Sequence, residues 1–280
     1  MIAMAMDDLP DGVDLTRPNA ARIYDYALGG AQNFAVDREF ADRMWRETGF
    51  SPVPYRLNRS FLRRAVRFMT ERGIDQFLDL GSGIPTVGNV HEIAQRANPA
   101  SRVVYVDNEP VAYAHATRLL AGSDNVTMLQ ADLRDVDTVL NHPDTARLLD
   151  FTRPVGLLTV AIMHFIPDAD DPAGILRRYR CALRGGGFHA LSHGTADGEP
   201  TFDGNRTVRM YQQTNTPGVL RTADQVRELL ADTELVEPGL TWTAQWRPDE
   251  SDPELARPED AGLYAAVAEV PPQRGKVQVA

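Results

Sequence analysis

Five short apolar runs, separated by segments with helical character, constrain this chain more than any other feature. Runs of this kind, rich in Val, Ile, Leu and Phe and not alternating with polar residues, are typical of strands buried on both faces of a parallel sheet. Helices between such strands predict a doubly wound α/β fold. The runs are 76–80, 102–107, 126–132, 155–163 and 187–193, and the helical segments lie around 87–97, 110–121, 135–149 and 172–183.

The two flanks of this alternating region have different patterns. Residues 17–72 are predicted to be helical, with interruptions at Gly29–Gly30 and at the 49–54 turn. After a helix at 222–230, residues 234–246 and 262–270 form two strands with no helix between them, which predicts an antiparallel pair at the edge of the sheet. We therefore expect an N-terminal helical cap over residues 1–60 and a sheet domain of seven strands over residues 61–280.

Charge and cysteine content limit the classes of function. The formal net charge of −10 argues against a non-specific nucleic-acid binder and against an anionic membrane surface. Cys181 is the single cysteine, so an intramolecular disulfide and a cysteine-rich zinc site are excluded, and we expect a buried, inert thiol in a helix. No secretory signal pattern and no run of roughly 18 apolar residues is present, which favours a cytoplasmic protein.

Carboxylates follow three successive predicted strands, and a Gly-x-Gly turn follows the first of them. Ligands of an open parallel sheet bind at the carboxyl ends of its strands. Asp79 precedes Gly81 and Gly83 in "LDLGSGIPT", and the next two strands end at Asp107 and Asp132. Each carboxylate alone is equally well explained as a helix cap, but together they predict one ligand site at this edge.

The same residues indicate which ligand fits. A dinucleotide fingerprint would have a third glycine where Thr86 stands, and Asp79 adds a negative charge where a pyrophosphate would bind. Carboxylates instead suit a cationic amino group, ribose hydroxyls and an exocyclic adenine amine, which together describe S-adenosylmethionine. An NAD-dependent oxidoreductase remains an alternative at this point. The chain has no H-E-x-x-H, Walker A or G-x-S-x-G motif, so metal, nucleotide-hydrolysis and serine-hydrolase chemistry have no support.

Several segments resemble known motifs. "FLDLGSGIPT", "VVYVDNEP", "LQADLRD" and "ALRGGGFHALSH" resemble successive motifs of the class I S-adenosylmethionine-dependent methyltransferases. With "RPNAARIYDYALGGAQNFAVDRE", the chain resembles, over about residues 14–270, one bacterial family of these enzymes that was once catalogued as a domain of unknown function. The resemblance implies a Rossmann-like, seven-stranded, mostly parallel sheet with helices on both faces. It also implies S-adenosylmethionine as the cofactor, S-adenosylhomocysteine as its product, and no particular acceptor.

The resemblance also assigns cofactor contacts by position. The amino-acid end of the cofactor would meet the glycine turn, the ribose the second strand, the adenine the third, and the flank of the cofactor the end of the fourth. The residues are Asp79, Gly81 and Gly83 at the glycine turn, Asp107 and Asn108 at the second strand, Asp132 and Leu133 at the third, and Ala161, Ile162 and Met163 at the fourth.

The N-terminal "YDYALGGAQNFAVDR" has no obvious role in an ordinary amphipathic helix. We expect residues 17–48 to fold across the carboxyl edge of the sheet as a lid, with Gly29–Gly30 as the bend between two short helices. Tyr24 and Tyr26 would then face the cofactor sulfonium, and Arg22 would bind its carboxylate. The alternative is that these aromatic residues are helix core and that the glycines only end a helix.

Methyl transfer to a hydroxyl needs a group that removes a proton, and two histidines at strand ends are candidates. These are His164 and His193, although a histidine at a strand end is more often only hydrogen-bonded. The long polar segment 195–221, with Arg209 and Tyr211, is the expected acceptor lid. The sequence thus predicts a methyltransferase that acts at oxygen or nitrogen of a small molecule, without a metal, nucleic acid or membrane. A non-catalytic S-adenosylmethionine-binding sensor and a homodimer stay open.

Overall fold

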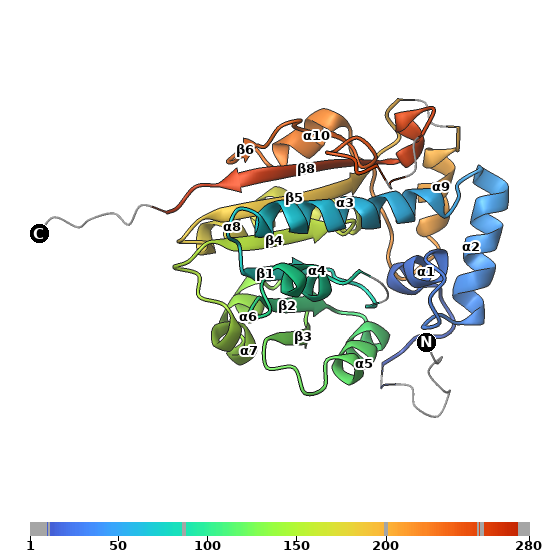
Figure 1. Cartoon of the computed structure of the whole chain (residues 1–280). Coiled ribbons are helices and arrows are strands. Elements are labelled where there is room, and N and C mark those ends of the chain that lie inside the picture. Colours follow the sequence, from blue (N-terminus) through green and yellow to red (C-terminus); the bar gives the residue numbers. More distant parts are fainter. Residues whose placement is uncertain are drawn as a thin grey trace, which may run out of the picture.

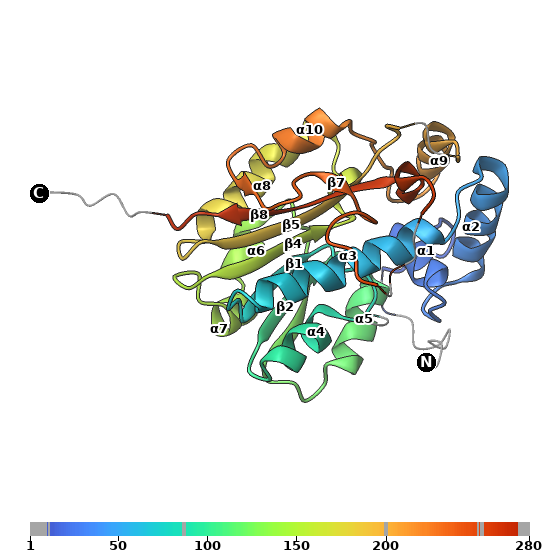
Figure 2. The same ribbon diagram turned by 45° about the horizontal axis from the view of Figure 1, so that its top comes forward.

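The five apolar runs form the parallel strands of one sheet. The computed structural model describes residues 10, 12–85, 88–198, 201–250, 252 and 255–273. The sheet has the order β3-β2-β1-β4-β5-β8-β6, and Figure 2 shows its central strands side by side. The chain leaves β1 in one direction to β2 and β3 and returns on the other side to β4, so the strand order reverses between β1 and β4. The parallel strands are β1 (Gln76–Leu80), β2 (Arg102–Asp107), β3 (Val126–Gln130), β4 (Val155–Val160) and β5 (Gly187–Gly194).

The last strands are antiparallel, as the sequence predicts. β8 (Leu263–Val270) pairs with β5 along its whole length, from Gly187 opposite Val270 to Gly194 opposite Leu263. On its other side β8 pairs with β6 (Glu234–Leu235) and with β7 (Thr241–Trp242), which have two residues each. Seven strands follow the order of the expected Rossmann-like sheet, with β8 inside the sheet and β6 at its edge, and β7 is an eighth strand that pairs with β8 beside β6.

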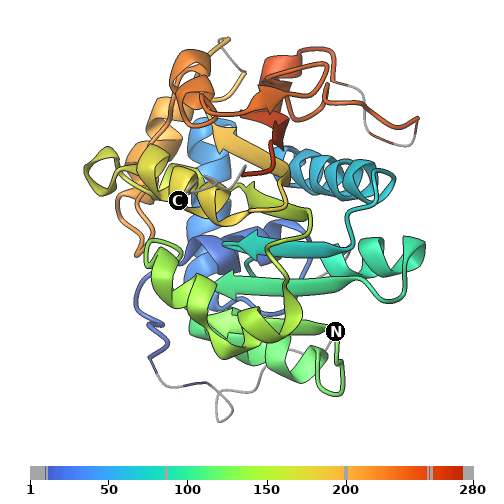
Figure 3. The ribbon, with the colours of Figure 1, turned by 90° about the vertical axis from the view of Figure 1, so that its left-hand side faces the viewer.

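Helices cover both faces of the sheet (Figure 3). One face packs against α3 (Val53–Thr70), α4 (Val90–Ala97) and α5 (Pro110–Leu119). The other face packs against α6 (Val136–Asn141), α7 (Pro143–Leu148), α8 (Pro172–Ala182) and α10 (Ala223–Glu228). Successive residues of β1 serve the two faces, because Phe77 joins the first cluster and Leu78 the second. This alternation explains why both residues are apolar.

A third apolar cluster lies beyond the carboxyl ends of the parallel strands. It joins α1 (Ala20–Ala27) and α2 (Ala35–Thr48) to Met210 and Tyr211 of α9 (Gly204–Tyr211), and Figure 1 shows these helices together at the end of the sheet where β1 and β2 end. α3 runs without a break through residue 60, the predicted end of the cap. We propose that the cap consists of α1 and α2 and that its boundary lies in the 49–52 turn.

The turn between α1 and α2 is built on Asp25 and two glycines. Asp25 Oδ2 accepts hydrogen bonds from the backbone N–H of Gln32 and from the side-chain amide of Asn33, both at 2.8 Å. A Cβ atom on Gly30 would lie 1.9 Å from Asp25 Oδ1, and Gly29 has φ +80°. Gly30 therefore follows from the close approach of Asp25, and Gly29 from its left-handed conformation, which other residues adopt only with strain.

Three details differ from the sequence-based expectations. The fourth strand ends at Val160, because Ala161 has φ +57° and cannot continue a strand. The segment 135–149 contains two helices, because Pro143 starts a new helix instead of continuing the first one. Cys181 lies in α8 as predicted but is exposed, so the expected burial of its thiol is wrong. Within the described residues, no helix has the length and apolar character needed to cross a membrane.

Candidate active site

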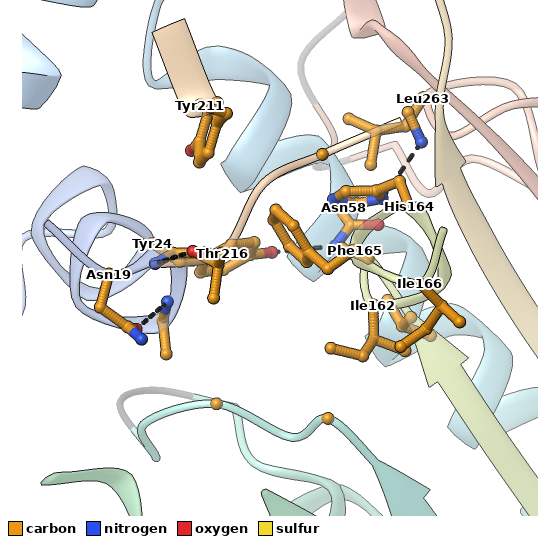
Figure 4. Close-up of a pocket in the computed structure, with 18 of the residues that line it drawn as sticks. Asn19, Tyr24, Asn58, Ile162, His164, Phe165, Ile166, Tyr211, Thr216 and Leu263 are labelled. Atoms are coloured by element: carbon orange, nitrogen blue, oxygen red, sulfur yellow. Dashed lines mark hydrogen bonds between the residues drawn. The ribbon is translucent and has the colours of Figure 1, made fainter. Parts of the chain in front are cut away.

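A cavity of about 400 Å³ lies at the carboxyl edge of the sheet, at the point where the strand order reverses. This volume is within the range of small-ligand pockets. Its walls come from the ends of β1, β2 and β4, from α1 and α3, and from the segment that contains α9. Figure 4 shows Tyr211 entering from one side, with Ile162, Phe165 and Ile166 opposite the turn that follows β1. Among the described residues, no group of three or more His, Cys, Asp or Glu side chains is arranged to hold a metal ion.

The glycine turn after β1 forms the floor of this cavity. Gly81 has φ +69°, its N–H donates to the Val106 carbonyl at 2.7 Å, and a Cβ atom there would lie 2.2 Å from Ile162 Cγ1. Gly83 has φ +66°, and its N–H donates to Asp107 Oδ2 at 2.7 Å. Position 81 thus requires glycine both for its backbone conformation and for lack of space. Position 83 favours glycine for its backbone conformation alone, because a Cβ there would have no atom within 4 Å.

Two of the three predicted carboxylates line the cavity in a buried state. Asp79 is 6% exposed and accepts no hydrogen bond from the described part of the chain. Burial raises its pKa to about 7, against the opposing effect of the positive charge of Arg59. Asp107 accepts the backbone N–H groups of Gly83 and Glu109, and burial raises its pKa as well. Asp79 therefore has its full hydrogen-bonding capacity free for a ligand.

The third carboxylate, Asp132, also lines the cavity but already has a cationic partner. Arg134 donates to both of its oxygens, with Nη2 at 2.6 Å from Oδ2, and these hydrogen bonds lower the pKa of Asp132. Arg134 also donates to Asp170 at 2.8 Å. Asp132 is thus fixed in place as an ionised group at the end of β3.

The three carboxylates and the glycine turn line one cavity. Comparison with known proteins shows the family of the chain. The family model described as S-adenosyl methyltransferase matches residues 6–271. The chain belongs to this S-adenosyl methyltransferase family. Its cofactor is S-adenosylmethionine, and the NAD-dependent alternative is thereby set aside.

Solved structures agree with this assignment. A DUF574 family protein from Streptomyces avermitilis has 42% sequence identity and a TM-score of 0.87, with 92% of this chain and 99% of that chain covered. A candidate methyltransferase from Thermobifida fusca has 39% identity and a TM-score of 0.86, with 93% and 98% covered. Comparison with curated proteins finds no match.

In this methyltransferase, Arg22 and Tyr26 do not line the cavity. Arg22 is fully buried, with its guanidinium 3.1 Å from Asp37 and 3.5 Å from Glu109. Tyr26 donates to Asp42 of α2 at 3.1 Å. Both side chains hold the cap together, and Arg22 also connects it to the segment after β2, so neither is part of the cofactor contact set that we propose below.

Tyr24 does line the cavity, where Figure 4 shows it near Asn58. A chain of hydrogen bonds links Tyr24 to the turn after β4. Its hydroxyl donates to the Tyr55 carbonyl at 3.1 Å and accepts from Asn58 Nδ2 at 2.9 Å. Asn58 Oδ1 accepts from Ser192 Oγ at 2.6 Å, and Ser192 Oγ accepts from the Ala161 N–H at 2.9 Å. These hydrogen bonds connect α1, α3 and β5 to the left-handed turn at Ala161 and hold that turn in place.

Of the remaining residues predicted to contact the cofactor, some line the cavity and one does not. Asn108, Leu133 and Ala161 line the cavity. Met163 is fully buried in the apolar cluster on the α8 face of the sheet and is not among the lining residues. Its neighbour Ile162, which was expected at the same flank, does line the cavity. The left-handed turn at Ala161 ends the strand earlier than expected.

The two histidines lie next to each other, with ring centroids 5.6 Å apart, but only His164 lines the cavity. Its Nδ1 accepts the Gly194 N–H at 3.3 Å, so the neutral ring carries its proton on Nε2. His193 is fully buried; its Nδ1 is 2.8 Å from the Gly194 carbonyl oxygen, and its Nε2 accepts from Arg221. Burial lowers the pKa of His164 well below its usual value and that of His193 to about 3. Both rings are therefore neutral at neutral pH, with each acceptor nitrogen already in use.

Several residues that line the cavity were not predicted from the sequence, among them one face of α3. Tyr55, Asn58, Arg59 and Leu62 line the cavity. Arg59 Nε is buried and has no hydrogen-bond partner among the described residues. The spacing of these four residues, at i, i+3, i+4 and i+7, marks one face of a helix. Asn58 and Arg59 are polar residues within this otherwise apolar face, and that pattern is the signal by which the lining residues of α3 could have been predicted.

Proposed function

We propose that Asp79 and Arg59 bind the amino-acid end of S-adenosylmethionine. That end of the cofactor is a zwitterion, with an ammonium group and a carboxylate. Within the described residues, Asp79 is a buried carboxylate without a hydrogen-bond partner, and the buried Nε of Arg59 has none either; both residues line the cavity beside the glycine turn. The Arg59 guanidinium lies over the Tyr24 ring, 5.6 Å from its centroid. This pair of opposite charges, with hydrogen-bonding groups that no described residue uses, is the observation that carries the proposal.

The other cofactor contacts follow the strands. Asp107 has accepting capacity left after its two backbone hydrogen bonds, which suits ribose hydroxyls. Leu133 and Ile162 supply apolar surface at the two sides of the cavity where we place the adenine and the thioether. Asp132 lies beside Leu133 and would reach the adenine amine only through an oxygen that Arg134 already contacts.

We propose that the acceptor is a small molecule, methylated at oxygen or nitrogen. The acceptor lone pair forms the bond to the methyl carbon, the carbon–sulfur bond breaks with its electron pair on sulfur, and the acceptor proton leaves to solvent. The cofactor supplies the activated methyl group. The protein therefore has to position the acceptor and exclude water. The position of the site in a cavity between the strand ends, α1 and α9 favours a small acceptor over a macromolecule.

Calorimetric titration with S-adenosylhomocysteine tests the cofactor proposal. We expect Asp79→Asn and Arg59→Met each to weaken binding by about 10- to 100-fold, as for the loss of a hydrogen bond to a charged group. Arg63→Met is the matched control, because Arg63 lies on α3 but is 39% exposed and pairs with Asp249 and Asp252. Equal affinity in all three variants would overturn the proposal. Transfer of labelled methyl groups to a small-molecule fraction tests the enzymatic part.

A further inference from the structure

The charged residues of the cavity are confined to the cofactor end. Those that line it are Arg59, Asp79, Asp107, Glu109, Asp132 and Arg134, on α3 and after β1, β2 and β3. The end formed by β4, β5 and the segment around α9 has no charged side chain among its described lining residues. The two ends of the cavity thus differ in chemistry, and the uncharged end is where an acceptor has room.

Aromatic rings line this uncharged end in an unbroken series, which we call the aromatic chamber: Phe202, Phe50, Tyr55, Tyr211 and Phe165. Phe50 contacts Phe202 with ring centroids 4.7 Å apart and Tyr55 at 5.7 Å. The hydroxyls of Tyr55 and Tyr211 are 3.1 Å apart, and the Tyr211 ring lies 5.9 Å from that of Phe165. Figure 4 shows Phe165 and Tyr211 on the two sides of the space between them. Such walls favour a planar ring as the guest.

The polar groups of the chamber are neutral as well. Burial raises the pKa of Tyr55 well above its usual value and that of Tyr211 to about 12, so both remain hydroxyls at neutral pH. His164 is uncharged, and its acceptor nitrogen already receives the Gly194 N–H. A charged acceptor would therefore lose its hydration here without gaining an opposite charge from the described lining residues.

The same neutral walls limit the acceptor atom. Neither histidine has a free acceptor nitrogen for a proton, and the described lining residues of the chamber include no carboxylate. An aliphatic alcohol gives up its proton only to a strong base. A phenol resembles the tyrosine side chain, with a pKa of about 10, and can lose its proton to water as transfer proceeds.

We propose that the acceptor is an uncharged, planar aromatic molecule that carries a phenolic hydroxyl. This inference rests on the proposed function, since it assigns the uncharged end of the cavity to the substrate of methyl transfer. The aromatic chamber holds the ring, and the hydroxyl points toward the cofactor end. The oxygen lone pair forms the new bond to the methyl carbon, sulfur keeps the electrons of the broken bond, and the phenolic proton passes to water.

A set of matched probes tests this inference by binding. The probes are 2-naphthol, its anionic relative 6-hydroxy-2-naphthoate, its cationic relative 6-aminomethyl-2-naphthol, and the saturated decahydro-2-naphthol. Each is titrated calorimetrically into the full chain saturated with S-adenosylhomocysteine. We expect saturable binding of 2-naphthol and at least about tenfold weaker binding of both charged relatives, from the cost of burying an unpaired charge. We expect decahydro-2-naphthol to bind about threefold or more weaker, because ring stacking is lost.

Variants locate the binding site. Phe165→Leu should weaken 2-naphthol binding by about three- to tenfold. Phe188→Leu is the control, because Phe188 packs on Phe68 outside the cavity. Val208→Arg places a cation on the α9 wall of the cavity, and it should bind 6-hydroxy-2-naphthoate more tightly than the wild type does. A gain of this kind cannot arise from misfolding.

The outcomes separate the two proposals. If S-adenosylhomocysteine binds but 2-naphthol does not, or if a charged or saturated relative binds as tightly as 2-naphthol, the inference about the acceptor fails and the proposed function stands. If S-adenosylhomocysteine itself does not bind, the proposed function fails. The same probes titrated into the cofactor-free chain then still show whether the chamber selects neutral aromatic rings.

Discussion

Cofactor affinity should rise with pH, because Asp79 must lose a proton before it can pair with the cofactor ammonium group. Its pKa of about 7 is raised by burial above the ordinary value of 3.8. With that pKa, ~3% of the molecules carry an ionised Asp79 at pH 5.5 and about half at pH 7.0. Apparent affinity scales with the competent fraction, so S-adenosylhomocysteine should bind ~15-fold more tightly at pH 7.0, which corresponds to ~1.6 kcal/mol.

Asp79→Asn removes the titrating group and is the decisive variant. It should bind the cofactor weakly and with little dependence on pH between 5.5 and 7.0. Glu109→Gln is the matched control, because burial also raises the pKa of Glu109 to about 7 although this residue pairs with Arg22. We expect Glu109→Gln to keep the wild-type pH dependence. Calorimetry in two buffers of different ionisation enthalpy would in addition detect the proton released from Asp79 on binding.

The same pKa shift makes a prediction about stability. Since the folded state binds the Asp79 proton more tightly than the unfolded state, this group destabilises the empty protein as pH rises from 3.8 toward 7. Asp79→Asn should therefore raise the Tm of the cofactor-free protein at pH 8 while it weakens cofactor binding. A pH dependence of binding that persists in Asp79→Asn, or a lower Tm of this variant at pH 8, would refute the reasoning.

Three further substitutions test the geometry of the site and the cap, each by chemical denaturation. Gly83→Ala, with φ +66° and open space around the new Cβ, should cost about 1–2 kcal/mol from backbone strain alone. Gly81→Ala adds a steric overlap and should cost about 1–3 kcal/mol more; equal losses at both glycines would contradict this. Arg22→Met leaves the buried Asp37 and Glu109 without their cation and should cost about 3–5 kcal/mol, and a loss below about 1 kcal/mol would show that the ion pairs contribute little.

The sheet was predictable because its signal is local. Each buried strand is a short run of apolar residues, and the alternation with helices fixes the parallel topology. The lengths of β6 and β7 were not predictable in this way. Residues 234–246 read as one strand, but Pro238 and Gly239 interrupt it, and two pairs of residues remain in contact with β8.

The candidate site was predictable only where topology alone places a side chain. Asp79 and Asp107 lie at the carboxyl ends of β1 and β2, and Asp132 follows β3. Because these strands end at one edge, the convergence of the three carboxylates could be inferred from their order in the sequence. Arg59 lies in an arginine-rich helix, and which of these arginines faces the cavity depends on how α3 packs. For Arg22 the sequence predicted a contact with the cofactor carboxylate. In the structure its guanidinium instead pairs with Asp37 and Glu109, which are distant in the sequence and which the fold brings next to it.

The position of β8 also determines when the sheet can be completed during synthesis. β5 pairs with β8 over eight residues, yet the whole stretch 195–262 is made between them. Until β8 is available, the apolar β5 has a free edge, which is a template for pairing with other chains. Long-range pairing of this kind is also slow to form. A chain shortened before residue 263 should therefore aggregate through β5, even though every residue of the cofactor end of the cavity would still be present.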